Sequence, residues 1–232
     1  MRPRKNVKRV IRKSKKAVAK KASTSIVRSG TPFADRFITK MKYVDTVNFT
    51  SGALFGFQQY RANSLYDLDY TNGGKDKQPI GFDSLCGAPA ANAPYASYTV
   101  TDSYIKVDII NASTVPFWAC IWPSREVGSA PLTPTIAMEQ SYAKYKCVGG
   151  STSTPKTTLY HKFSTAKLFA ETHKTITSED NYTGTYLGSP ANIWYWNVYL
   201  ISADAATGIS AYTRIELINS AEFSDRNQLA QS

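Results

Sequence analysis

The chain has 232 residues and a formal net charge of +11, from 28 Lys and Arg against 17 Asp and Glu. Twelve of the basic residues fall within residues 1–28, where no acidic residue occurs, so the remaining 16 are balanced by all 17 acidic residues. This distribution excludes a globular protein with a uniformly basic surface, and the 15 Tyr, 10 Phe and 4 Trp argue against a wholly disordered chain.

The first 37 residues are predicted to form a largely disordered basic arm and linker. Adjacent cations repel one another, and an isolated helix of this length is marginal in water. The twelve cations are Arg2, Arg4, Lys5, Lys8, Arg9, Arg12, Lys13, Lys15, Lys16, Lys20, Lys21 and Arg28. A run of cations without acidic or aromatic residues is a ligand for phosphate backbones and has little means of reading base sequence.

A second interpretation of the arm is nuclear import. The basic positions that fit an import signal are Arg9, Arg12, Lys13, Lys15 and Lys16. The full run of cations is longer than an import signal requires, so both roles can hold together. Binding to an anionic membrane is a third and weaker alternative.

Residues 38–225 are predicted to form one all-β domain, followed by a tail at 226–232. A first strand runs through Met41 and Phe49 and is interrupted by Asp45. In residues 104–111, Ile105, Val107 and Ile109 share one face, which indicates a half-buried strand. The apolar run 115–122 predicts a buried strand that ends at Pro123.

Four further strands are predicted toward the C-terminus. Weak patterns at 142–148 and 159–169 precede a stronger one at 193–201, whose even positions are wholly apolar. These even positions are Trp194, Trp196, Val198 and Leu200. Because the two tryptophans continue the same apolar face as Val198 and Leu200, this pattern predicts that they are core residues rather than a base-stacking platform. The last strand is 212–223, with Ile215 and Leu217 opposite Arg214 and Glu216.

Long connections rich in Gly, Pro, Ser, Thr and Asn separate these strands, at about 67–97, 123–140, 149–157 and 174–192. Loops of this length are uncommon in a compact domain unless they carry function. Seven or eight strands, no convincing long helix and elaborate loops predict an eight-stranded jelly-roll β-sandwich.

The search for catalytic chemistry is nearly empty. The two histidines, His161 and His173, lie 12 residues apart without a zinc-binding partner motif, so no metal ligand, catalytic residue or cofactor is predicted. A Cys–His nucleophile pair stays open, although structural cysteine is the stronger interpretation. Asp67 and Asp69 superficially match a calcium loop or a carboxylate pair at a subunit interface, and we favour an Asx-rich turn.

Four stretches resemble the capsid proteins of circular, replication-initiator-encoding single-stranded DNA viruses, the circovirus-like group. Residues 57–69 (FQQYRANSLYDLD) are similar to the family's F-R-x-N-S-x-Y-D-P-D segment, and residues 78–83 (QPIGFD) to the Gln-Pro-x-Gly-x-Asp segment that often follows. Residues 95–111 match its Y-x-x-Y-x-V-x-x-S-x-I-x-V strand, and residues 212–223 look like its terminal strand.

The resemblance implies a structural, non-enzymatic capsid protein that self-assembles into a T=1 icosahedral shell of sixty copies. It further implies arms that point inward around a circular single-stranded DNA genome, with localisation in the virion and, during assembly, in the host nucleus, where a host import receptor is a possible partner. Sixty arms would supply about 720 positive charges, the right order to neutralise much of a genome of a few thousand phosphates.

Three alternatives are kept beside this interpretation. The chain could be the capsid protein of a single-stranded RNA or satellite virus, because the residues do not distinguish DNA from RNA. It could be a nucleic-acid-binding β-sandwich protein that forms no shell. A cupin-like enzyme is the weakest alternative, since it needs a clustered His and Glu metal set.

Overall fold

A computed structural model describes residues 34–49, 54–72, 77–88, 93–128, 133–204 and 206–227. All of them belong to one of the chain's two structural units, Phe33–Ser232. Residues 1–33 of the predicted arm and linker, with the twelve cations, lie outside the described residues. Residues 34–37 are described, and β1 begins at Phe37, one residue before the predicted start of the domain.

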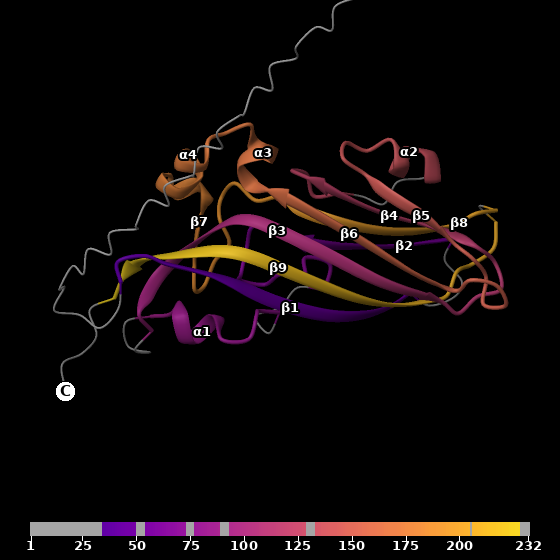
Figure 1. Cartoon of the computed structure of the whole chain (residues 1–232), viewed down its shortest axis with the longest axis horizontal. Coiled ribbons are helices and arrows are strands. Elements are labelled where there is room, and N and C mark those ends of the chain that lie inside the picture. The colour runs from indigo at the N-terminus through magenta and orange to yellow at the C-terminus, as the bar shows by residue number, and fades with distance from the viewer. Residues whose placement is uncertain are drawn as a thin grey trace, which may run out of the picture. The chain divides into compact units, whose positions relative to one another are not determined.

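Two antiparallel sheets make up the described structure (Figure 1). The first, called here the β1 sheet, has the order β1-β9-β3-β6, and a short strand β7 pairs with β3. Its strands are β1 (Phe37–Phe49), β9 (Ala211–Arg226), β3 (Tyr95–Asn111), β6 (Lys156–Ser164) and β7 (Thr183–Thr185). The second, called the β2 sheet, has the order β2-β8-β4-β5. Its strands are β2 (Phe55–Arg61), β8 (Tyr195–Ser202), β4 (Phe117–Ser124) and β5 (Lys144–Val148).

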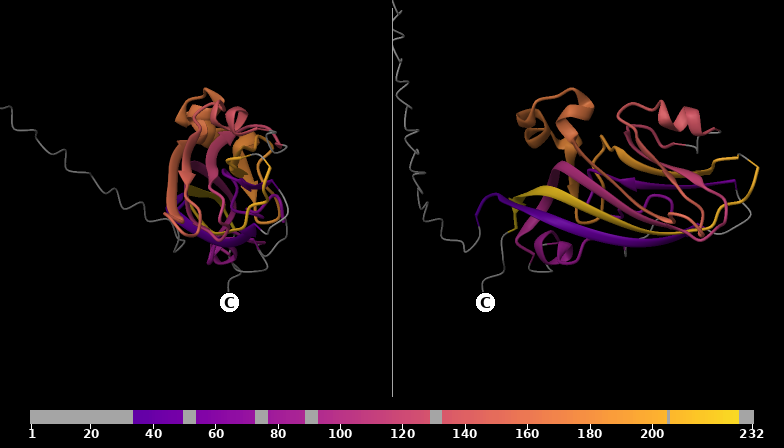
Figure 2. Two further views of the ribbon diagram at one scale, coloured as in Figure 1. Left: turned by 90° about the vertical axis from the view of Figure 1, so that its right-hand side faces the viewer. Right: turned by 45° about the vertical axis from the view of Figure 1, so that its right-hand side comes forward.

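The strand order is that of a jelly roll. With β7 set aside, the eight remaining strands counted along the chain stand in the orders 1-8-3-6 and 2-7-4-5, so that the chain passes between two four-stranded sheets. This arrangement of two interlocked Greek keys defines the jelly roll. The turned views in Figure 2 show β1, β9 and β3 in one layer and β2 and β8 in the other. The predicted fold class is therefore confirmed.

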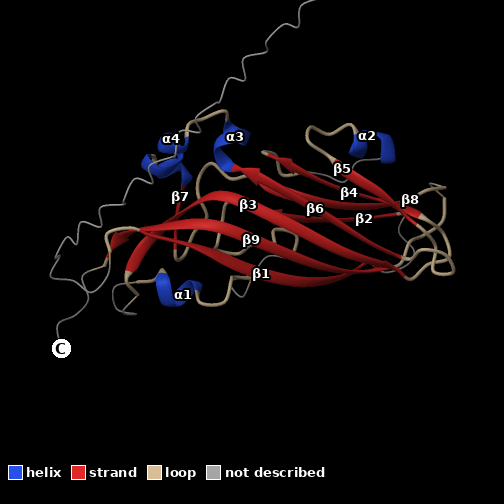
Figure 3. Ribbon diagram, in the orientation of Figure 1, coloured by secondary structure: helices blue, strands red, loops and turns tan. Residues whose placement is uncertain are grey.

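Short helices decorate the loops, and Figure 3 shows α2, α3 and α4 on the side of the sandwich opposite α1. They are α1 (Phe82–Leu85), α2 (Pro134–Met138), α3 (Thr165–Phe169), α4 (His173–Ser178) and the 3₁₀ turn η2 (Asp180–Tyr182). Hydroxyl side chains cap three of them: Thr133, Ser164 and Thr172 accept a hydrogen bond from the backbone N–H three residues ahead. The long connections are thus folded rather than extended.

The core between the sheets contains the alternating apolar faces that the sequence predicts. Ile105, Val107 and Ile109 lie in it, as do Trp194 and Trp196. Both indole N–H groups find buried hydroxyl acceptors, on Thr165 at 3.1 Å and Ser103 at 2.9 Å. The interpretation of the two tryptophans as core residues is confirmed, because neither ring is exposed.

Asp45 interrupts the core-facing side of β1, as the sequence indicates. Its Oδ2 accepts a hydrogen bond of 3.0 Å from the Tyr60 hydroxyl on the opposite sheet. Burial, followed by the nearby Asp45 and Asp69 carboxylates, raises the pKa of Tyr60 well above its ordinary value. The hydroxyl therefore stays protonated, which is the state that can donate to Asp45.

Three predicted boundaries are wrong. The strand predicted to stop before Pro123 continues to Ser124. Pro123 lies opposite Trp196 of β8, beyond Ile121 and Lys144, the last residue pair that joins β4 to β5. Because no strand pairs with Pro123 on its other side, the missing backbone N–H leaves no acceptor unpaired. The strand predicted for 159–169 ends at Ser164, whose hydroxyl caps the N-terminus of α3. The long connection predicted for 67–97 contains α1 and the first residues of β3.

Two strands are absent from the sequence prediction, β2 and the short β7, which lies within the connection predicted for 174–192. β2 contains Gln58 and Gln59, and both side chains are almost fully buried. Because these side chains are polar, the sequence pattern does not indicate a buried strand. Gln58 Nε2 donates to Asp69 Oδ1 at 2.6 Å, and Gln59 Nε2 donates to Asn197 Oδ1 at 2.9 Å. Asp69 and Asn197 lie on other segments of the chain, so no local sequence pattern predicts these hydrogen bonds.

Candidate nucleic-acid interface

The outer face of the β1 sheet is the described surface with the clearest chemical character. It consists of the outward-pointing residues of β1, β9, β3 and β6. These residues form rows of paired positions across the four strands, from the row that contains Lys40 to the row that contains Asn48. Twenty side chains belong to this stretch, and none of them is buried. We call it the tyrosine–lysine face. In Figure 1 these four strands lie in front of β2 and β8, with no helix across them.

Six cations and three carboxylates occupy this face, which gives it a net charge of +3. The cations are Lys40, Lys42, Lys106, Lys156, Lys162 and Arg214, and the carboxylates are Asp102, Asp108 and Glu216. Since all residues from 29 onward sum to −1, the rest of that sequence carries −4. The charge of the near-neutral body is therefore unevenly distributed, with a positive excess on this face and a negative excess in the remaining residues.

Each carboxylate on the face is held by a cation. Lys42 lies 3.0 Å from Glu216, Lys162 lies 3.6 Å from Asp102, and Asp108 is reached by both Lys106 at 3.2 Å and Arg214 at 2.6 Å. Partial burial alone would raise the pKa of Asp108, but hydrogen bonds from Thr158, Arg214 and Lys106 hold the pKa below its ordinary value. Asp108 thus stays charged and anchors two cations.

Tyrosines alternate with these cations. On three strands a tyrosine stands two residues before a cation: Tyr104 before Lys106, Tyr160 before Lys162, and Tyr212 before Arg214. Residues two apart on a strand share a face. Across the β3–β6 ladder Tyr104 stands opposite Lys162 and Lys106 stands opposite Tyr160, so the two residue types alternate in both directions.

A shallow depression of about 450 Å³ lies at one end of this face. It is lined by residues 108–110 of β3 and 156–158 of β6.

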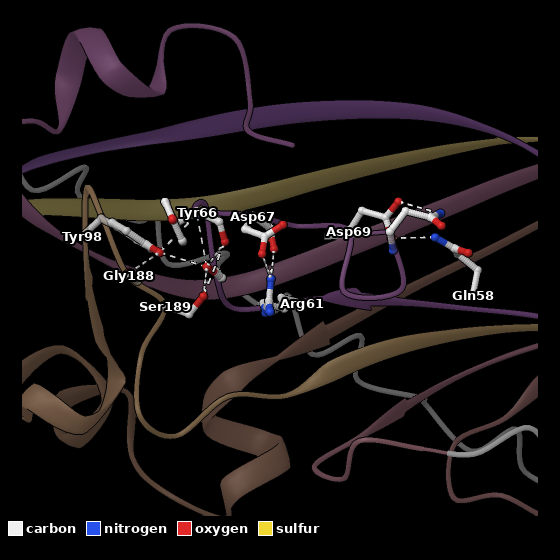
Figure 4. Close-up of polar contacts among 10 residues, drawn as sticks. Gln58, Arg61, Tyr66, Asp67, Asp69, Tyr98, Gly188 and Ser189 are labelled. Carbon is white, nitrogen blue, oxygen red and sulfur yellow. Dashed lines mark hydrogen bonds and ion pairs between the residues drawn. The ribbon is translucent and has the colours of Figure 1, made fainter. Parts of the chain in front are cut away.

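The loop that follows β2 places the two aspartates of the calcium-like motif in separate polar contacts, shown in Figure 4. The Asp67 carboxylate forms an ion pair of 2.5 Å with Arg61, whose guanidinium also lies 5.0 Å from the centroid of the Tyr70 ring. Asp69 accepts hydrogen bonds from Gln58 and, at 3.0 Å, from the backbone N–H of Asn72. The second contact is the local one expected of an Asx-rich turn.

Ser64 organises the other half of the same loop. Its hydroxyl lies 2.9 Å from the Tyr98 hydroxyl and 3.0 Å from that of Ser189, and it donates to the Tyr66 carbonyl at 2.7 Å. Burial raises the pKa of Tyr98 to about 12. The segment that carries the family resemblance thus acts as a hydrogen-bonded joint between β2, β3 and the residues before β8.

The cysteines and histidines do not assemble a catalytic centre in the described part of the chain. Burial raises the pKa of both Cys86 and Cys120 to about 12, so neither is a thiolate near neutral pH. Cys147 is exposed on β5. His161 sits on β6 beside Trp196, whereas His173 begins α4. Among the described residues no group of three or more His, Cys, Asp or Glu could hold a metal ion.

Within the described residues, no helix is long and apolar enough to cross a membrane.

Sequence reasoning missed the tyrosine–lysine face, although a signal for it exists. The sequence pattern places Arg214 and Glu216 only on the side of their strand opposite Ile215 and Leu217. The repeated Tyr-x-Lys or Tyr-x-Arg spacing on three strands is the pattern that could have pointed to it. What the sequence could not supply is the adjacency of these strands, because β3, β6 and β9 are far apart along the chain.

Strand order and surface together define a jelly-roll protein with a basic, tyrosine-bearing sheet face. No family model matches the chain, and no curated protein matches it. Among solved structures, Desmodium yellow mottle tymovirus is similar at 13% identity and a TM-score of 0.38, over 87% of this chain and 96% of that chain. Tobacco necrosis virus is similar at 11% identity and a TM-score of 0.44, over 84% and 85%.

A decameric BFDV capsid protein is similar at 7% identity and a TM-score of 0.40, over 82% of this chain and 99% of that chain. The fold assignment rests on the strand order of this chain itself.

Proposed function

We propose that the chain is a structural capsid protein that self-assembles into a small T=1 icosahedral shell of sixty copies and packages circular single-stranded DNA through its basic arm. The observation that carries the proposal is the division of charge. Twelve cations without an acid precede a jelly-roll body whose sequence from residue 29 onward sums to −1.

The two halves of this division have different physical uses. Sixty strongly charged bodies would repel one another at shared contacts, whereas nearly neutral bodies can pack closely. Cations in the arm can replace the counterions of a nucleic acid, which supplies affinity that depends little on sequence. The jelly roll is an architecture that viral capsids use, along with lectins and cupins.

The ordered loops of the body support a role in fixed contacts between copies. The loop after β2 is held by Asp69, Ser64 and the ion pair of Arg61 with Asp67. The turn after β8 is held by Asp204, which accepts hydrogen bonds from Ser202 and Thr207. Loops that are already ordered lose less conformational entropy when a partner binds.

The remaining parts of the proposal follow from the arm. Its positions Arg9, Arg12, Lys13, Lys15 and Lys16 serve nuclear import, with a host import receptor as partner, so assembly takes place in the host nucleus and the product is the virion. The protein acts without a cofactor and without catalysis.

Electron microscopy of the purified full-length protein, with and without single-stranded DNA and over a range of salt, tests the proposal. We expect closed particles of uniform size. A protein that stays monomeric or dimeric by light scattering under every condition contradicts it and favours a nucleic-acid-binding protein that forms no shell.

The nucleic acid extracted from particles identifies the genome type. Digestion by deoxyribonuclease and resistance to ribonuclease are expected. The reverse result would replace the DNA part of the proposal with packaging of single-stranded RNA, while the capsid part would stand.

A further inference from the structure

We propose that the tyrosine–lysine face is a second nucleic-acid contact, made by the body and independent of the arm. Single-stranded nucleic acid would lie across β3, β6 and β9, with bases against Tyr104, Tyr160 and Tyr212 and phosphates against the neighbouring cations. The inference rests on the proposed function and deepens it, because it assigns the β1 sheet to the genome side of the subunit.

The arrangement of the side chains fits a single strand. An unpaired base offers an aromatic face that stacks on a tyrosine ring, and the phosphates between bases need cations beside each ring. Tyr160 is 59% exposed and Tyr212 is 56% exposed, so both rings are accessible. Tyr104 and Tyr160 are diagonal neighbours across the β3–β6 ladder, a spacing of about 7–8 Å between backbones.

The carboxylates on the face do not prevent phosphate binding. Water screens exposed ion pairs such as Lys162–Asp102, which therefore contribute little to stability, so a lysine can turn to a phosphate at little cost. The side chains of Lys42, Lys162 and Arg214 are 55%, 67% and 55% exposed, which leaves them free to reorient. With the excess of +3, the face attracts a polyanion while the rest of the body repels one.

Chain continuity gives the second argument. Arg28, the last cation of the arm, stands nine residues before Phe37, where β1 begins. Nine extended residues span at most about 30 Å. Among the described strands β1 pairs with β9 alone and brings Lys40 and Lys42 to the face, so the chain leads from the arm directly into the edge strand of this sheet.

The composition of the arm makes the inference testable in the full-length protein. The first 28 residues contain no aromatic residue, so every aromatic cross-link to a nucleic acid must come from elsewhere in the chain. The experiment irradiates the full chain with a 5-iododeoxyuridine oligonucleotide and maps the cross-linked peptides by mass spectrometry. We expect cross-links at Tyr160 and Tyr212 in clear excess over Tyr145.

Tyr145 is the matched control. It is 51% exposed, close to the exposure of Tyr160, but it lies on β5 of the other sheet and packs edge-on against Trp118. Cross-links that are equal at Tyr145 and Tyr160, or that are absent from the three tyrosines of the face, overturn the proposal.

A salt titration gives an independent measurement. In Lys162→Gln the loss of one phosphate contact should make the negative slope of log K against log salt shallower by about 0.7 for the single-stranded oligonucleotide. Lys174→Gln, an exposed position on α4, should leave the slope unchanged. Equal slopes for both variants and the wild type would overturn the phosphate contact at Lys162.

Failure of the proposed function is a separate outcome. Both binding measurements use the full chain with free oligonucleotide and do not require assembly. Absence of particles would therefore remove the capsid assignment and leave the face intact, whereas particles without cross-links at the face would remove only the second contact.

Discussion

His161 lies on β6 with its ring centroid 5.3 Å from that of Trp196 and its Nε2 3.0 Å from the Tyr142 carbonyl oxygen. Burial, and to a lesser extent the Lys144 and Lys167 ammonium groups, lower the pKa of His161 below its ordinary 6.5. The unfolded chain therefore binds a proton at a higher pH than the folded chain does.

This difference predicts the pH dependence of stability. Between the lowered folded pKa and about 6.5, the unfolded state binds more protons, so the unfolding free energy should rise as pH increases through that interval. His161→Gln should flatten the part of the profile that lies just below about pH 6.5 in urea denaturation. His173→Gln, which replaces the other histidine, is measured beside it and shows whether the slope belongs to His161 in particular. Parallel profiles for all three proteins would show that His161 does not contribute.

Residues of the same type differ in burial, and their hydrogen-bond and ion-pair partners explain the difference. Asp69 is 1% exposed and hydrogen-bonded to Gln58, whereas Asp35 has an 80% exposed side chain and lies 3.2 Å from Arg226. A buried carboxylate is tolerated only when donors surround it. The sequence indicated a turn at Asp69 and gave no sign of Gln58, which is eleven residues earlier on another element.

At the scale of elements, β7 shows how a short strand is held in place. It pairs with β3 through three rungs, among them Tyr98 opposite Gly184. A Cβ atom at Gly184 would lie 2.5 Å from the Tyr98 ring, so only glycine lets the two strands approach this closely. Tyr98 in turn holds Ser64 and thereby the loop after β2.

Gly184→Ala should destabilise the protein by about 1–3 kcal/mol, the usual cost of overpacking a close contact. Gly188→Ala is the matched control, because its nearest side-chain atom, Thr185 Oγ1, lies 3.5 Å away and the change should stay within about 0.5 kcal/mol. Urea denaturation measures both. Equal midpoints for the two variants would mean that the Tyr98 ring moves aside without loss.

The predicted elements failed where a local signal competed with a distant one. Pro123 looked like the end of a strand, yet it lies opposite Trp196 at a point where β4 has a neighbour on one side only. Ser164 is a helix cap that went unnoticed inside an apolar pattern. β2 was overlooked because the partners of Gln58 and Gln59 are remote.

For the whole molecule, the separation of charge predicts the effect of removing the arm. Deleting residues 1–28 changes the formal net charge from +11 to −1. If contacts between copies lie in the body, particles should still form, but with much less nucleic acid, because the cations that release counterions are gone. The ratio of absorbance at 260 and 280 nm in purified particles measures this.

A variant that keeps the arm at full length with its twelve cations changed to glutamine separates charge from length. It should behave like the deletion. Unchanged nucleic-acid content in either variant would contradict the assignment of packaging to the arm and would leave the tyrosine–lysine face as the main contact.

Local sequence patterns are enough to establish the concentration of basic residues in residues 1–28, the near-neutral remainder, the β class and the inward faces of the strongest strands, such as Ile105 with Val107 and Trp194 with Trp196. These features are local, because the period of two along a strand follows from the backbone alone. Which outward faces share a sheet follows from the pairing of distant strands in the folded chain. Tyr104, Tyr160 and Arg214 lie on three strands brought together by long-range ladders, and no single strand encodes its neighbours.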